Sequence, residues 1–192
     1  MKIGVLALQG TSPFTGRRST GSASSRPRCG CRVSSTRWPA SSCPGESTTL
    51  LKLLDTWEFV PALEKLHSAG KPIFGTCAGL ILLARDVESP AQFSLGLIDI
   101  TAERNAYGRQ KESFETVGEG DLGAGQGPLK MVFIRAPRIR RMGPAVTPLA
   151  HHRDECVMAR QGSVLVASFH PELTDETKVH DYFARMVGES RS

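Results

Sequence analysis

Short apolar runs recur along the chain, separated by longer stretches in which apolar residues follow helical spacing. Five of these runs have the length and composition of strands covered on both faces. They lie at residues 3–8, 72–74, 97–102, 129–134 and 163–169. Helical spacing predicts helices at 47–70, where Gly70 offers a C-cap, at 78–85 and at 177–186. Residues 113–127 contain five glycines and predict a loop.

This alternation of strands and helices predicts an α/β fold. We expect three layers, with an open, mostly parallel sheet and helices on both of its faces. In such sheets the functional groups gather at the carboxyl ends of the strands. A chain of 192 residues has the size of one ordinary domain, so we expect a single domain over 1–192.

Residues 11–43 do not share this pattern. Nine of them are Ser and six are Arg, and the segment has no Leu, Ile, Asp or Glu. One interpretation is a Ser/Arg-rich loop. However, a long structureless loop directly after a core strand is unusual inside a compact domain.

The genetic code offers a second interpretation of this segment. The reading frame that joins the last base of each codon to the next two bases permits His-Arg-Glu-Ala-Leu across residues 14–19. Across residues 37–44 it permits Leu-Ala-Gly-Leu-Val-Leu-Pro. The first peptide suits a helix and the second a buried strand, which an α/β domain needs here. We therefore hypothesise that 11–43 is an out-of-frame segment.

The charge distribution argues against a nucleic-acid partner. The formal net charge is +5, but six of the 24 basic residues lie in 11–43. Without those six, 18 basic and 19 acidic residues remain, a net charge of −1. The basicity is local, whereas a nucleic-acid-binding domain carries it across a surface.

The five cysteines and the apolar runs indicate a cytoplasmic protein. The cysteines (29, 31, 43, 77 and 156) form no CxxC pair, which argues against a disulfide framework or a structural zinc site. No apolar run approaches the length of a membrane span, and 3–8 is too short for a secretory signal. We expect no metal and no membrane contact.

The strongest chemical signal is Cys77, within Gly75-Thr76-Cys77-Ala78-Gly79. A Gly-x-nucleophile-x-Gly sequence between a strand and a helix is typical of a nucleophile elbow, whose strained turn requires small neighbours. The N–H of Ala78 would then face a developing oxyanion. Alternatively, Cys77 is a small buried residue, as cysteines often are.

A matching base follows the last predicted strand, at His170-Pro171-Glu172. Residues two apart in an extended chain face the same side, so Glu172 can hold the His170 imidazole in one tautomer. His170 can then deprotonate Cys77 and protonate a leaving amine. A lone histidine is more often structural, but the elbow and the His-x-Glu sequence together favour catalysis.

Three further segments offer groups that could bind a substrate. Gly45 precedes a helix that Ser47 can cap, and its N–H can approach a substrate carbonyl. Arg104 and Arg135 each lie at or just after a strand end. An Arg fork binds the α-carboxylate of a free amino acid well, although such residues are also ordinary surface charges.

These segments together resemble the glutaminase subunit family of pyridoxal 5'-phosphate synthase. The elbow and His170-Pro171-Glu172 are shared with other class I glutamine amidotransferases. The runs at 104–110 and 133–137 resemble this family more specifically, together with 6–10 and 44–49. The resemblance covers 159 of the 192 residues and fails across 11–43.

The resemblance implies hydrolysis of L-glutamine to L-glutamate and ammonia through a thioester on Cys77. His170 would be the general acid and base, and Glu172 its orienting carboxylate. The ammonia would pass to a barrel-shaped synthase partner in a hetero-oligomer, without a cofactor in this subunit. The implied glutamine contacts are Gly45, Glu46, Ser47, Ala78, Arg104, Ile134 and Arg135, with the N–H groups of Gly45 and Ala78 as the oxyanion hole.

The chain departs from the family pattern at the oxyanion loop. It reads Pro44-Gly45-Glu46, where the family has Pro-Gly-Gly-Glu, and Pro44 removes an N–H. We expect the chain as written to fold poorly. Two alternatives stay open: an amidotransferase subunit of another synthase, or a catalytically impaired interaction subunit.

Overall fold

A computed structural model describes residues 59–104, 106, 113–123 and 125–190 of this chain. These residues lie in a unit that spans Glu58–Ser192. The strand predicted at 3–8, the segment 11–43 and the first half of the helix predicted at 47–70 lie outside the described residues. Those predictions, and the single domain over 1–192, stay predictions.

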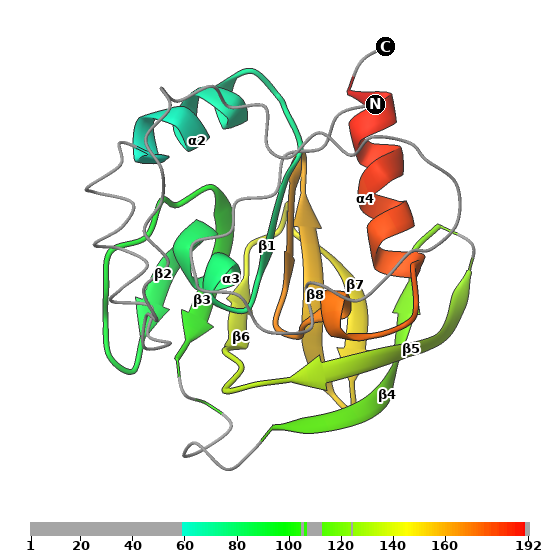
Figure 1. Cartoon of the computed structure of the whole chain (residues 1–192). Coiled ribbons are helices and arrows are strands. Elements are labelled where there is room, and N and C mark those ends of the chain that lie inside the picture. Colours follow the sequence, from blue (N-terminus) through cyan, green and yellow to red (C-terminus); the bar gives the residue numbers. More distant parts are fainter. Residues whose placement is uncertain (1–58, 105, 107–112, 124, 191–192) are drawn as a thin grey trace, which may run out of the picture. The chain divides into compact units, whose positions relative to one another are not determined.

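The described residues alternate between a few helices and many short strands (Figure 1). In chain order the elements are α2 (Phe59–Ser68), β1 (Ile73–Thr76), α3 (Ala78–Leu83), β2 (Ala84–Glu88), β3 (Ile98–Glu103), β4 (Phe114–Asp121), β5 (Gln126–Phe133), β6 (Arg138–Met142), β7 (Thr147–His152), β8 (Glu155–Gln161), β9 (Val164–Ala167), the 3-10 turn η2 (Pro171–Leu173) and α4 (Lys178–Glu189). Gly70 follows α2 with φ of 67°, as the predicted C-cap requires.

The strands form two sheets. The larger has the order β1-β9-β8-β7-β4-β5, and the smaller has the order β2-β3-β6. Parallel pairing is found between β1 and β9 and between β2 and β3. The other pairings of the described strands are antiparallel. Short connections join β4 to β5, β7 to β8 and β8 to β9, and such hairpins can link only antiparallel strands. The parallel character predicted from the sequence is thus found in only part of the described sheets.

Helices cover both faces of the larger sheet, as predicted. The side chains of β9 alternate between two apolar clusters, because successive residues of a strand face opposite sides. One cluster joins Val164 and Val166 to α3, and the other joins Leu165 and Ala167 to α4. Helix α3 contributes Leu80, Ile81 and Leu83 to the first cluster, and α4 contributes Val179 and Met186 to the second.

The helix predicted at 78–85 is shorter than expected. It ends at Leu83, and Ala84 already begins β2. The segment before β3 accounts for this end, because its N–H groups bind the last helical carbonyls. The N–H of Leu95 donates to the Leu82 oxygen at 2.7 Å, and that of Leu97 donates to the Leu83 oxygen at 2.9 Å.

The prediction of a loop at 113–127 is wrong, because most of this segment forms β4 and the start of β5. Its glycines allow close approach between strands instead of breaking them. A Cβ on Gly118 would lie 2.5 Å from the His151 carbonyl oxygen and 2.6 Å from the Met131 methyl carbon. Glycine inside a strand often marks such a contact. Strands β6, β7 and β8 were not predicted.

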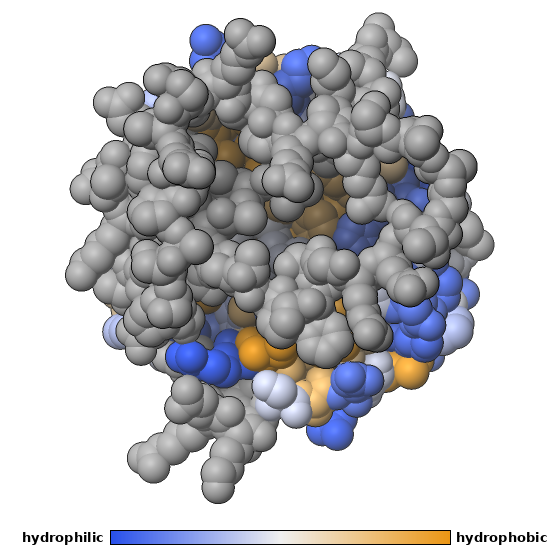
Figure 2. Space-filling view, in the orientation of Figure 1, coloured by the Kyte–Doolittle hydropathy of each residue, from blue (hydrophilic) through white to orange (hydrophobic). Residues whose placement is uncertain are grey.

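Large apolar side chains at the surface are dispersed over several elements. Among the residues that the structure describes, the exposed ones are Leu66, Phe93, Val117, Ile134, Met142 and Leu173. In Figure 2 the coloured part of the visible face likewise shows polar and apolar residues side by side. No helix among the described residues is long and apolar enough to cross a membrane.

Candidate active site

Cys77 occupies a strained turn between β1 and α3. Its φ of 48° and ψ of −104° lie outside the usual regions for a residue with a side chain. A Cβ on Gly75 would lie 2.7 Å from the carbonyl carbon of Gly79 and from a Leu83 methyl. The turn therefore brings α3 directly against β1, and only glycine fits at position 75. At Gly79 a Cβ would meet nothing within 4 Å among the described atoms, so space does not impose that glycine.

Two adjacent parallel strands bring Cys77 and His170 to the same end of the sheet. The pairing of β1 with β9 ends at Thr76 beside Ala167, and the Cys77 N–H donates to the Ala167 oxygen at 2.9 Å. His170 follows β9 by three residues, and its N–H donates to the Val132 oxygen at 2.8 Å. The expected location at the carboxyl ends of strands is therefore found for both residues.

Glu172 binds the imidazole of His170. Its Oε1 lies 2.7 Å from His170 Nδ1. The intervening chain is the turn η2, not the extended chain that we expected, and this turn brings the carboxylate back to the ring. A carboxylate on Nδ1 fixes the tautomer and leaves Nε2 to exchange a proton with its neighbour.

The charge state of His170 is set by its two partners. Burial lowers the pKa of His170, but hydrogen bonds with Cys77 and Glu172 outweigh it and raise the pKa to about 10. Burial likewise raises the pKa of Glu172, yet its hydrogen bond with His170 brings that pKa below the usual value. The His170 imidazole therefore carries its proton at neutral pH and can give that proton to a leaving amine.

A second acceptor for the thiol lies just beyond β5. The Ile134 carbonyl oxygen is 3.7 Å from Cys77 Sγ. Arg135, the next residue, has a φ of 49°, so the chain turns sharply here. The backbone carbonyls of Val132 and Ile134 were not identified from the sequence, since main-chain groups leave no signal in residue type.

The other predicted site residues are not gathered around Cys77 to the same degree. Ala78 begins α3 directly after the cysteine, and Arg135 follows Ile134. Arg104 follows β3 of the smaller sheet, where its N–H donates to the Glu88 oxygen at 3.0 Å. Gly45, Glu46 and Ser47 lie outside the described residues.

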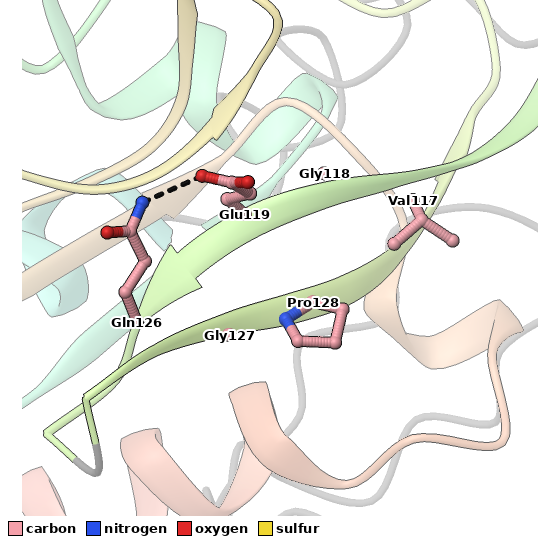
Figure 3. A pocket seen from close by; sticks show the side chains of 6 residues that line it. All are labelled: Val117, Gly118, Glu119, Gln126, Gly127 and Pro128. Atoms are coloured by element: carbon pink, nitrogen blue, oxygen red, sulfur yellow. Dashed lines mark hydrogen bonds between the residues drawn. The ribbon is translucent and has the colours of Figure 1, made fainter.

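An open hollow of about 460 Å³ lies elsewhere, on the β4–β5 hairpin (Figure 3). Val117 and Glu119 line it from β4, and Gln126 and Pro128 from β5, with a hydrogen bond of 2.7 Å between Gln126 and Glu119. None of its lining residues is a predicted site residue, and it contains no nucleophile. Cys77, and not this hollow, is therefore the candidate active site. The described residues contain no group of three or more side chains that could hold a metal ion.

A cysteine elbow and a His–Glu pair at the strand ends of an α/β sheet fit the class of hydrolases that use a cysteine nucleophile. The chain belongs to the SNO glutamine amidotransferase family, whose model matches residues 42–189.

Two similar proteins carry the same name, and a similar solved structure is described as a glutamine amidotransferase. The pyridoxal 5'-phosphate synthase subunit PdxT of Brevibacillus brevis is 51% identical over 149 residues, which cover 77% of this chain and 76% of that protein. The protein of the same name from Koribacter versatilis is 46% identical over 200 residues, covering 100% and 98%. A crystal structure of a glutamine amidotransferase has a TM-score of 0.68 at 45% identity and covers 75% of this chain and 76% of its own.

Proposed function

We propose that this chain is the glutaminase subunit of a pyridoxal 5'-phosphate synthase and hydrolyses L-glutamine to L-glutamate and ammonia. One observation carries the chemistry: Cys77 and His170 stand at the ends of adjacent parallel strands, with Glu172 on the His170 ring at 2.7 Å. The synthase assignment is supported by relatives named as its PdxT subunit at 46–51% identity.

The geometry supports a thioester route. The sulfur of Cys77 attacks the side-chain amide carbon of glutamine, and the carbonyl oxygen becomes an oxyanion beside the Ala78 N–H. The carbon–nitrogen bond then breaks as His170 gives its proton to the leaving amine, which departs as ammonia. His170 next takes a proton from water, whose oxygen attacks the thioester carbon. The carbon–sulfur bond breaks, and glutamate is released.

Residues around this dyad would hold the substrate. We assign glutamine contacts to Gly45, Glu46 and Ser47 of the loop before the first helix, with the Gly45 N–H as the second oxyanion donor. Arg104, Ile134 and Arg135 complete the proposed set. The position of Ile134, whose carbonyl lies 3.7 Å from Cys77 Sγ, supports its inclusion.

The proposal extends to the setting of the enzyme. The partner would be a barrel-shaped synthase subunit, which takes up the ammonia within a hetero-oligomer in the cytoplasm. The chemistry of the dyad requires no metal and no cofactor in this subunit.

Residues 11–43 are, we propose, an out-of-frame segment of the gene. Their composition supports this, since they lack Leu, Ile, Asp and Glu. The family match begins at residue 42, next to the end of the segment, which supports it further. Sequencing the gene tests the idea, and one clean frame encoding these residues would end it.

A glutaminase assay with the synthase partner tests the function. Wild type plus partner should release ammonia from glutamine, and Cys77→Ala should release none. Cys156→Ala is a matched control, because burial raises the pKa of the Cys156 thiol to about 11 and keeps it unreactive. Wild type that releases no ammonia would instead favour an impaired interaction subunit. Activation by a different synthase would favour the other alternative.

A further inference from the structure

Strand β5 lies at one edge of the larger sheet, and its outward-facing backbone groups are occupied by the segment that begins at His170. Edge strands of sheets carry backbone donors and acceptors without strand partners. In this chain three successive outward positions of β5, two residues apart, are bound by residues 170–178.

The three contacts follow the strand in order. The Val132 oxygen accepts the His170 N–H at 2.8 Å. The Lys130 N–H donates to Glu176 Oε2 at 2.9 Å. The Pro128 oxygen accepts from Lys178 Nζ at 2.7 Å, and the same ammonium lies 3.2 Å from Glu176 Oε1. We refer to Glu176 and Lys178 as the β5 clasp.

The residue that follows β5 contacts the cysteine. The Ile134 oxygen lies 3.7 Å from Cys77 Sγ. Strand β5 and the next residue therefore contact both members of the dyad, His170 through the Val132 oxygen and Cys77 through the Ile134 oxygen. The clasp fixes where the segment that carries His170 and η2 lies along this strand.

A neighbouring ion pair differs from the clasp in kind. Asp175 Oδ1 binds the side-chain Nζ of Lys130 at 2.8 Å, and the Asp175 side chain is 81% exposed. Glu176 is only 22% exposed and binds the backbone itself. Exposed ion pairs contribute little, whereas a charge-assisted bond to a backbone N–H is stronger and directional.

We propose that Glu176 and Lys178 are positioning residues that set the alignment of His170 with Cys77 by fastening residues 170–178 to the edge of β5. The expected effect on turnover rests on the proposed function, because it requires that the chain hydrolyse glutamine. The positioning of His170 itself does not. A misplacement of about 1 Å at a reacting group can lower the rate by about a hundredfold. Because the clasp does not touch the dyad itself, its loss should act on kcat and leave KM unchanged.

The test compares four full-length chains with the synthase partner: wild type, Glu176→Ala, Glu176→Gln and Asp175→Asn. We expect Glu176→Ala to lower kcat by at least about tenfold with KM unchanged. Glu176→Gln should recover most of the activity, because its amide oxygen can still accept from the Lys130 N–H. Asp175→Asn should match wild type.

A second readout does not depend on glutamine hydrolysis. The rate of Cys77 alkylation by iodoacetamide, followed by mass spectrometry across pH 5 to 10, reports on the Cys77–His170 pair directly. We expect the profile of Glu176→Ala to shift to higher pH, whereas Asp175→Asn keeps the wild-type profile. A different result is a wild type that releases no ammonia while Glu176→Ala still shifts the alkylation profile and Asp175→Asn does not. That result would contradict the proposed function and support the positioning role of the β5 clasp.

Two outcomes would overturn the clasp. One is a Glu176→Ala chain with wild-type kcat and an unshifted alkylation profile. The other is loss of activity that tracks only a lower melting temperature, with the alkylation profile of the folded protein unchanged. An equal effect of Asp175→Asn would also count against it, since that change removes a surface ion pair alone.

Discussion

At the scale of single residues, Cys77 makes three contacts, one through its backbone N–H and two through its thiol. Its N–H binds the Ala167 oxygen, its sulfur faces the Ile134 oxygen, and its thiol pairs with the His170 ring. The first joins two backbone groups, so most substitutions would leave it intact. The other two both use the Cys77 side chain, so the chemistry can be removed without dismantling the elbow.

Replacement of Glu172 by Gln should separate chemistry from folding. Gln keeps the size of the side chain but can stabilise the wrong imidazole tautomer, so kcat should fall by about 10²–10⁴. Steady-state ammonia release measures this. Glu119→Gln, on the distant hairpin, is the control and should retain wild-type activity. A Glu172→Gln chain with full activity would contradict the role of the carboxylate.

The raised pKa of His170 predicts a pH dependence of stability. Its folded value of about 10 exceeds the ordinary 6.5, so its contribution is fully present below pH 6.5 and is lost as pH rises through about 10. The free energy of unfolding of wild type should therefore fall relative to His170→Asn across this range. Denaturant titrations at pH 6, 8 and 10 measure the difference. A constant difference would contradict the assigned charge state.

At the scale of elements, the parts of the site that the sequence predicted are local ones. The elbow needs five consecutive residues and the His–Glu pair needs three, so each leaves a complete signal in the chain. The β4 strand was missed because its glycines are typical of a loop. In the fold, Met131 and His151 lie against Gly118, and Ala150 and Leu129 lie against Gly120. The Ile134 and Val132 carbonyls were missed because their use depends on strands that meet only in the fold.

The close contact between β1 and α3 predicts a specific cost at Gly75. Gly75→Ala places a methyl group 2.7 Å from the Gly79 backbone, which cannot move aside easily, and should destabilise the protein by about 1–3 kcal/mol. Activity should fall as well, since the elbow must open. Thermal and denaturant unfolding measure the loss.

Gly188→Ala is the matched control for this prediction. Gly188 lies in α4, and a Cβ there would meet nothing within 4 Å among the described atoms. Alanine in a helix should stabilise it by up to about 1 kcal/mol. Equal effects of the two substitutions would show that the elbow contact is not as tight as described.

At the scale of the whole molecule, the α/β class and the two covering helices followed from the apolar periodicity. The extent of antiparallel pairing did not, because periodicity identifies a strand without its neighbour or direction. The short β4–β5, β7–β8 and β8–β9 connections indicate antiparallel pairing. They could be recognised only once all six strands of the larger sheet had been identified.

Restoring the alternative reading frame across 11–43 should increase the stability of the folded protein. A gene with compensating single-base changes at both ends of the segment would encode apolar, helix- and strand-forming residues there, so the product should melt more cooperatively and at a higher temperature. Calorimetry of both products measures this. A chain that folds cooperatively as written, with glutaminase activity, would contradict the prediction.

The place of β9 in the larger sheet also determines when the enzyme becomes competent. This strand inserts between β1 and β8, yet it is the last strand of the described chain to leave the ribosome. A growing chain that ends before residue 164 already contains Cys77 but has no base beside it. Pairing of such distant segments is slow compared with local folding. With the roles proposed for Cys77 and His170, a nascent or truncated subunit therefore cannot release ammonia before its sheet is complete.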